Sequence, residues 1–197
     1  RGVYQFVGDR LDQDRTLRFL EDRLPGLHVA GKSALGRHGY RQNVAFNENT
    51  IVWGEGRARW PAWAKKRFDC RFEIRHLFEE SYPHSERVSR LPEASEGPLV
   101  ACPEAALLEM LSEVGVSEGV EESRNIMEAM VRVRPSQISR AIASCRMVKA
   151  VRLCALWAAE LHLEWAESAR AAVPAGKRKG RWVATLGNGK TLTLAEL

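Results

Sequence analysis

The sequence predicts an α+β fold, in which a small mixed sheet is followed by a helical layer and a C-terminal hairpin. Three observations lead to this fold class. Short apolar or alternating segments, typical of strands, lie mainly in the first half of the chain. Apolar residues at helical spacing prevail in the second half. Near the end, two short segments flank Gly187-Asn188-Gly189-Lys190, which has the chemistry of a hairpin turn.

In the first half, Asp12 can cap a helix that Pro25-Gly26 ends. Apolar and charged residues alternate from Phe68 to Leu77, which is typical of a strand with one face in water. The strands expected here are residues 2–7, 50–53, 68–77 and 99–101. The helices expected here are residues 13–24 and 31–39.

The polar segment from Glu79 to Gly97 predicts a loop that could act as a hinge at 79–97. Pro103 then takes the first position of a strong helix, where its missing N–H is tolerated. The helices expected from there are residues 103–114, 119–131, 136–145 and 148–161, the last with an extension over 165–171. The helix from Val148 is apolar on most faces, so we expect it in the middle of the helical layer. The hairpin strands are expected at 181–186 and 191–194.

The chain carries a moderate excess of positive charge, and that charge is sorted along the sequence. Its 197 residues contain 30 Lys and Arg against 25 Asp and Glu, a net charge of +5. Six basic and no acidic residues lie between Arg132 and Arg152, and five basic and no acidic residues between Lys177 and Lys190. Sorting of this kind indicates contact with polyanions such as nucleic acid.

Nothing in the sequence indicates a membrane or secretion. There is no run of eighteen apolar residues and no basic-then-apolar leader. The four cysteines show neither C-x-x-C spacing nor the density of a disulfide framework. We therefore expect reduced thiols, a cytoplasmic location and no membrane partner.

Motifs for a metal, a cofactor or a nucleophile are weak. The five histidines are far apart in the sequence, without ligands at helical spacing. Ser33 lies in Gly31-Lys32-Ser33-Ala34-Leu35-Gly36, which is not a G-x-S-x-G elbow. The glycines at 187 and 189 form too short a loop to cradle a phosphate. We expect no cofactor, no metal and no enzymatic activity.

One enzymatic alternative stays open, a Mg²⁺-dependent nuclease-like enzyme that uses Asp69 and Glu73. Such enzymes hold Mg²⁺ with an Asp and a Glu-x-Lys on neighbouring strands. Here Asp69, Glu73 and Arg75 would share one face of one strand, with Arg in place of the Lys. A solvated sheet face with alternating charges gives the same pattern without any chemistry, and we favour that interpretation.

Two segments are candidates for binding nucleic acid. In the first, Trp60 and Trp63 adjoin Lys65-Lys66-Arg67, and aromatic rings beside cations can stack bases. We favour the alternative in which the two indoles fasten a short helix onto the sheet.

The second segment is the basic helix of the C-terminal half. Arg146, Lys149 and Arg152 fall at i, i+3 and i+6, along one stripe that Arg140 could join. A solvated face and a binding face explain this stripe equally well. The other candidates follow in the last basic segment and are Lys177, Arg178, Lys179 and Arg181.

Short motifs spread from Arg1 to about Gly189 recur in one family. In chain order they are Arg1-Gly2-Val3-Tyr4, Gly8-Asp9, His28-Val29-Ala30-Gly31-Lys32-Ser33-Ala34-Leu35, His38-Gly39, Pro61-Ala62-Trp63, Cys102-Pro103-Glu104-Ala105-Ala106-Leu107-Leu108-Glu109-Met110-Leu111, Ile126-Met127-Glu128, Ser144-Cys145-Arg146, Val148-Lys149 and Arg152-Leu153. Their order and spacing resemble those of the AbiEi-type antitoxins of type IV, or abortive-infection, toxin–antitoxin systems.

The resemblance implies an N-terminal winged helix that binds operator DNA, followed by a larger C-terminal domain. Residues 1–9 would be the remnant of the wing strand and linker, and residues 10–197 the C-terminal domain, with the winged helix itself lacking. The protein would repress its own operon, and the C-terminal domain would carry the antitoxin activity. The toxin of such pairs resembles a nucleotidyltransferase, and a stable complex is not required. No oligomeric state follows from the resemblance.

We therefore expect Arg146, Lys149 and Arg152 to supply phosphate contacts or toxin-facing contacts. A winged helix reads bases, and basic residues of the following domain can add contacts that position the protein on DNA without reading its sequence.

Overall fold

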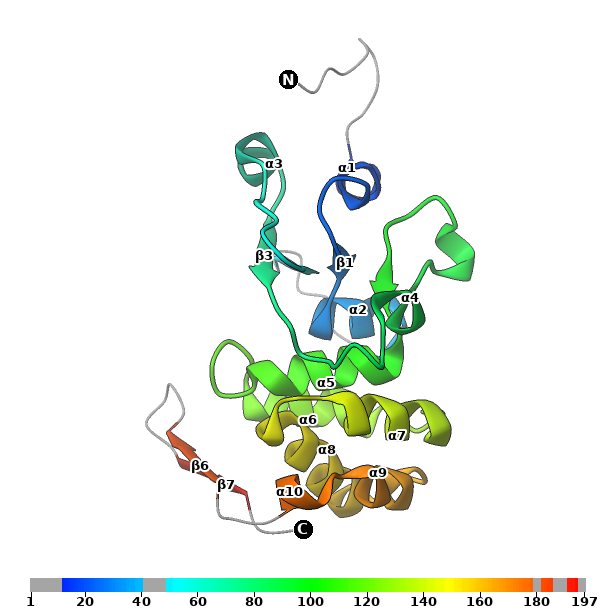
Figure 1. The fold of residues 1–197 in the computed structure, drawn as a ribbon, viewed down its shortest axis with the longest axis vertical. Coiled ribbons are helices and arrows are strands. Elements are labelled where there is room, and N and C mark those ends of the chain that lie inside the picture. The colour runs from blue at the N-terminus through cyan, green and yellow to red at the C-terminus, as the bar shows by residue number, and fades with distance from the viewer. Residues whose placement is uncertain (1–11, 41–48, 179–181, 186–190, 195–197) are drawn as a thin grey trace.

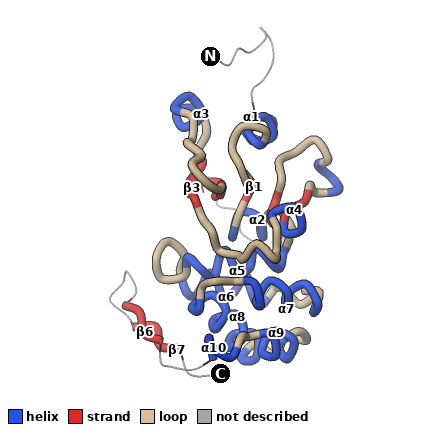
Figure 2. The backbone as a smooth tube through the Cα atoms, in the orientation of Figure 1, coloured by secondary structure: helices blue, strands red, loops and turns tan. Residues whose placement is uncertain are grey.

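The computed structural model describes residues 12–40, 49–178, 182–185 and 191–194. A five-stranded sheet lies toward one end and a stack of helices toward the other (Figures 1 and 2). The predicted α+β fold class, with a mixed sheet before a helical layer, is confirmed. None of the described helices is long and apolar enough to cross a membrane.

The sheet has the strand order β3-β2-β1-β5-β4. The central strand β1 pairs antiparallel with β2 and parallel with β5, while β3 runs parallel to β2 and β4 antiparallel to β5. The strands are β1 His28–Val29, β2 Thr50–Gly54, β3 Cys70–Ile74, β4 Val88–Ser89 and β5 Val100–Ala101. The strands expected near 50–53, 68–77 and 99–101 are confirmed, and the one expected at 2–7 lies outside the described residues.

Helix α1 (Gln13–Glu21) begins where the sequence predicts, because the side chain of Asp12 accepts a hydrogen bond from Arg15 N at 2.7 Å. It ends at Glu21, before the predicted end at residue 24. The Glu21 carboxylate accepts a hydrogen bond from Leu99 N and so fastens α1 to the segment that leads into β5.

Helix α2 (Gly31–Arg37) follows β1 at once and packs against the central helix α5. Gly31 has a φ of +51°, in the left-handed region that favours glycine. A Cβ there would lie 3.6 Å from Met110 N, an ordinary contact, so the glycine is required by its backbone and not by lack of space. Helix α3 (Ala62–Arg67) precedes β3.

The segment 79–97 is not the irregular loop that its polar composition predicts. It contains α4 (His84–Arg87), β4 and the short 3₁₀ helix η1 (Pro92–Ala94). Most of its polar residues face solvent, whereas Tyr82, Arg87, Val88 and Leu91 are buried. One strand of the sheet therefore comes from this segment, and a hinge at 79–97 stays a prediction.

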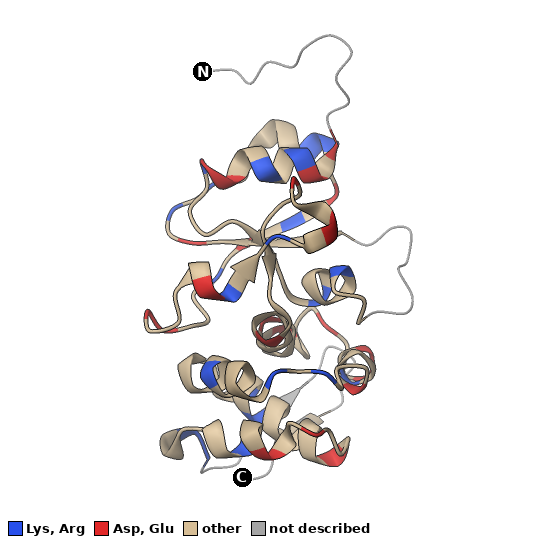
Figure 3. Cartoon of the chain, turned by 90° about the vertical axis from the view of Figure 1, so that its right-hand side faces the viewer, with Lys and Arg blue, Asp and Glu red and all other residues tan. Residues whose placement is uncertain are grey.

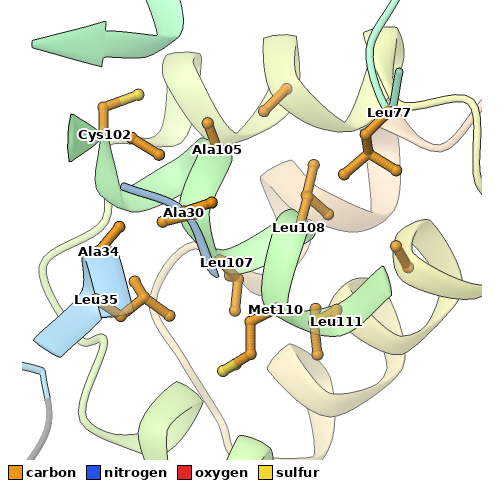
Figure 4. Close-up of a cluster of buried hydrophobic side chains, with 14 of the residues drawn as sticks. Ala30, Ala34, Leu35, Leu77, Cys102, Ala105, Leu107, Leu108, Met110 and Leu111 are labelled. Carbon is orange, nitrogen blue, oxygen red and sulfur yellow. The ribbon is translucent and has the colours of Figure 1, made fainter. Parts of the chain in front are cut away.

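Helix α5 (Pro103–Glu113) lies at the centre of the molecule. The predicted proline at its first turn is confirmed, and every residue after it in the helix is buried. Ala30, Ala34 and Leu35 lie on one side of it, next to Leu107 (Figure 4). The predicted apolar stripe thus understates its burial, because α5 has α2 on one side and the helical stack on the other.

The helical stack contains α6 Val120–Glu128, α7 Pro135–Ser144, α8 Val148–Glu160, α9 Ala166–Ala172 and α10 Ala175–Arg178. The predicted extension of α8 is wrong. The chain leaves the helix at His162, with a φ of +52°, and α9 is a separate helix. The predicted hairpin is confirmed as β6 (Trp182–Thr185) paired antiparallel with β7 (Thr191–Leu194).

Candidate partner and nucleic-acid interface

The basic stripe expected on α8 does not face solvent. Arg152 is 1% exposed and Lys149 is 8% exposed. The guanidinium of Arg152 donates to Arg178 O at 2.7 Å. Because α8 packs against α5 and α9, its i, i+3, i+6 face is turned into the molecule. The expectation that Lys149 and Arg152 lie on an exposed binding face is therefore corrected.

The neighbouring candidates Arg140 and Arg146 are exposed, but each already has an acidic partner. Arg140 pairs with Glu86 at 2.5 Å, and Arg146 pairs with Glu79 at 2.8 Å. Both pairs are exposed to solvent, so each contributes little to stability. Each arginine can therefore exchange its carboxylate partner for another anion.

The last group of candidates is described in part. Lys177 Nζ donates to Cys145 O at 2.5 Å, and Arg178 Nε donates to Val173 O at 2.9 Å. These cations thus hold the end of the helical stack together. Lys179 and Arg181 lie outside the described residues.

A second basic surface lies at the opposite end of the molecule, on and before α3 (Figure 1). Its members are Arg57, Arg59, Lys65, Lys66 and Arg67, and we call it the α3 basic surface. All five are exposed, and none has an acidic partner within 4.0 Å in the described part of the chain. On α1, by contrast, basic and acidic residues are interleaved (Figure 3).

The indole of Trp60 stacks on Phe72 of β3, with ring centroids 5.2 Å apart. Trp60 and Trp63 are both half-buried against the core, so the favoured interpretation of these residues, anchors for a short helix, agrees with the structure. The same anchoring holds the cations of α3 on a fixed support.

A pocket of about 450 Å³ opens where the sheet meets the helical stack. Its walls come from the ends of β2 and β3, from the C-terminal end of α5 with the turn after it, and from the N-terminal end of α8. The apolar lining residues are Trp53, Leu77, Val116 and Met147. The charged lining residues are Arg75, Glu113, Arg146 and Lys149.

Bonds between the walls hold this pocket open. Arg146 N donates to Leu77 O at 2.8 Å and joins the start of α8 to the chain leaving β3. The guanidinium of Arg75 lies 3.0 Å from a carboxylate oxygen of Glu113 and joins the same segment to α5. The pocket is thus formed by the fold and does not depend on a ligand.

Lys149 joins α8 to the end of α5, because its Nζ donates to Val114 O at 2.9 Å. An ammonium group has three donors, and Lys149 uses one of them on a described residue. None of the described carboxylates lies within 4.0 Å of it. Burial lowers the pKa of this ammonium group, and the nearby charge of Glu113 opposes that effect.

Two histidines that are far apart in the sequence meet beside α5. Nε2 of His84 lies 3.2 Å from Nδ1 of His28. The buried carboxylate of Glu109 accepts a hydrogen bond from Gly31 N at 2.9 Å and lies 3.1 Å from His28 Nε2. Burial, together with the charge of His28, lowers the pKa of His84 to about 4. Sequence spacing did not reveal this cluster, because the fold alone brings α4 to β1.

Among the described residues, no group of three or more His, Cys, Asp or Glu side chains could hold a metal ion. The pair proposed for a nuclease is not assembled either. Asp69 precedes β3 and is exposed, while Glu73 pairs with Arg75 at 2.7 Å and with Arg71 at 3.2 Å. The nuclease alternative finds no support in this geometry.

The α3 basic surface has the charge that is typical of surfaces facing polyanions. The chain belongs to the AbiEi antitoxin family, the transcriptional regulators of type IV toxin–antitoxin systems. The model of this family matches residues 47–193, and the model of its N-terminal domain matches residues 1–46. The resemblance drawn from the sequence motifs is therefore confirmed.

The N-terminal match corrects the expectation that this domain is lacking from the chain. The family models meet between residues 46 and 47, whereas we expected a boundary between residues 9 and 10. In the structure β1 and α2, which precede residue 46, share one sheet and one core with the rest of the chain. The division at residue 9 stays a prediction.

The RV2827C protein from Mycobacterium tuberculosis has a similar structure, with a TM-score of 0.58 and 14% sequence identity. The match covers 87% of this chain and 58% of that protein. At this identity the similarity concerns the fold alone. No curated protein matches the chain.

Proposed function

We propose that the protein is the antitoxin of a type IV toxin–antitoxin system and also represses its own operon. The observation that carries this proposal is the match of two models of one family to residues 1–46 and 47–193, which leaves few residues unmatched. In this proposal the protein acts in the cytoplasm by binding, without catalysis and without a cofactor.

Its two partners are operator DNA and a toxin. Operator DNA is bound mainly through a winged helix, as the sequence resemblance implies. The toxin resembles a nucleotidyltransferase, and neutralisation does not require a stable complex. The antitoxin activity resides in the part of the chain from residue 10 onward.

Basic residues of the described domain support operator binding by contacting phosphates. An exposed cation without an acidic partner can bind a phosphate and break no existing ion pair. This favours the α3 basic surface as the site of the phosphate contacts. Arg140, Arg146, Lys177, Arg178, Lys179 and Arg181 stay candidates for phosphate or toxin-facing contacts. Lys149 and Arg152 take part only from within the fold, because both are buried.

The antitoxin role is tested by a growth rescue. The chain is co-expressed with the nucleotidyltransferase-like product of the adjacent reading frame, and growth is followed. We expect growth to be restored. A folded chain that leaves the cells arrested would contradict the antitoxin role of this part of the protein.

The phosphate contacts are tested by the salt dependence of operator binding. We expect the triple variant Lys65→Gln, Lys66→Gln, Arg67→Gln to bind more weakly, with a slope of log K against log salt that is less steep by about 2.7, or about 0.9 for each lost contact. A matched control is the double variant Arg132→Gln, Arg170→Gln, which removes exposed cations of the helical stack. An unchanged slope in the triple variant would move the phosphate contacts to other residues.

A further inference from the structure

We propose that the pocket between β3, α5 and α8 binds a small amphipathic monoanion, that is, an organic molecule with one acidic group on an apolar body. The acidic group can be a carboxylate, a sulfonate or a monoanionic phosphate ester. This inference goes beyond the antitoxin and regulatory roles, and it does not depend on them.

The pocket has a cationic side that lacks a full set of partners. Lys149 is buried, has one described acceptor for its three donors and no described carboxylate within 4.0 Å. A buried ammonium group is costly unless it is paired, so an anion in the pocket would stabilise it.

The N-terminus of α8 lies on the same side of the pocket. This helix has 13 residues, and its N-cap residue Met147 makes no side-chain hydrogen bond to the first turn. The first N–H groups of a helix have no partner within the helix, and they carry the positive end of the helix dipole. An acidic group beside Met147 and Lys149 would thus meet N–H donors and a positive charge together.

The other side of the pocket is apolar and partly exposed. Val116 is 78% exposed and Met147 is 39% exposed, and both are among the few large apolar side chains that the described structure exposes. Trp53 also lines the pocket with its largely buried ring. An apolar body bound in the pocket would cover Val116 and Met147.

The charges of the walls favour a single negative charge. Arg75 lies within 3.0 Å of both Glu73 and Glu113, and Arg146 pairs with Glu79. These pairs leave Lys149 as the cation of the lining without a carboxylate partner in the described part of the chain. The volume of about 450 Å³ falls within the range of small-molecule sites.

The test uses two fluorescent probes that differ in their charge. The anion is 1-anilinonaphthalene-8-sulfonate, and the neutral counterpart without the sulfonate is N-phenyl-1-naphthylamine. Both are titrated into the folded protein, and the stoichiometry and the dissociation constants are measured. We expect one site for the anion, with an affinity at least tenfold higher than that of the neutral probe.

Variants then locate the site. Lys149→Met should weaken binding of the anion at least tenfold and leave the neutral probe unchanged, because a hydrogen bond to a charged group is lost. Val116→Asp places a carboxylate on an exposed position of the rim and should also weaken binding of the anion. Since Val116 is exposed, this second variant keeps its fold even if Lys149→Met does not.

Matched controls are Lys66→Met on α3 and Val131→Asp, a second exposed valine outside the pocket lining. Both should bind the two probes as the unchanged protein does. The proposal is overturned if the anion does not bind, if the two probes bind equally well, or if Val116→Asp leaves the affinity for the anion unchanged. A pocket that accepts only an acidic side chain of a protein partner would leave both probes unbound and would also overturn it.

Discussion

Removal of the Glu109 carboxylate by substitution is the perturbation whose effect on stability the structure predicts most directly. It is fully buried in α5, accepts a hydrogen bond from Gly31 N at 2.9 Å and lies 3.1 Å from His28 Nε2. In Glu109→Ala both groups lose this partner inside the core. Each buried group left without a hydrogen bond costs about 1–3 kcal/mol, so the two together cost about 4 kcal/mol of unfolding free energy.

Urea denaturation at pH 7, followed by circular dichroism, measures this loss. The matched control is Glu128→Ala at the exposed end of α6, where we expect a change within about 0.5 kcal/mol. A double-mutant cycle with His28→Ala should give a coupling energy of at least about 1 kcal/mol, since the two side chains are in contact. A loss below about 1 kcal/mol in Glu109→Ala, or additive effects in the cycle, would show that Gly31 N and His28 do not depend on this carboxylate.

Three further predictions concern the same core. Burial holds the pKa of His84 near 4 in the folded state, against an ordinary value of 6.5. Protonation of His84 therefore favours the unfolded chain, and the free energy of unfolding should fall by about 2 kcal/mol between pH 7 and pH 5. His84→Gln should remove most of that fall, as urea titrations at both pH values would show. Gly31→Ala should lower the stability by roughly 1–2 kcal/mol because Gly31 has a left-handed φ. Gly176→Ala, in a helix with open space around it, should raise the stability by up to about 1 kcal/mol. Equal effects of the two substitutions in thermal unfolding would contradict this prediction. Burial raises the pKa of Cys70 to about 11 and raises that of Cys154 further. A thiol reagent at pH 7.5 should therefore label the native protein slowly and react with Cys70 first. Rapid labelling of Cys154 would contradict the fold.

The sequence predicts the longer elements of this fold well, because local patterns encode them. Asp12 and Pro103 mark the starts of α1 and α5, and alternation marks β3. The strands β1 and β4 have two residues each, too few for any periodicity, and only their partners in the sheet define them.

The candidate site was harder to predict than the fold. Helical spacing predicts one stripe of Arg146, Lys149 and Arg152, but α8 begins only at Val148, so Arg146 precedes the helix. The spacing also does not say whether Lys149 and Arg152 are turned to solvent or to the core. That depends on the packing of α8 between α5 and α9. The pocket at Trp53 was not predictable at all, because its lining comes from segments that only the tertiary structure brings together.

The position of β1 has a consequence for how the chain is made. β1 is synthesised before its parallel partner β5, which follows about seventy residues later, so the middle of the sheet cannot form until that later segment has left the ribosome. Until then the apolar residues of β1 and α2 have no α5 to cover them. A fragment that begins at residue 47 lacks the central strand, and supplying residues 12–40 as a separate peptide should restore its cooperative unfolding. Residues 12–40 therefore cannot complete their packing until the segment that contains β5 and α5 has been synthesised.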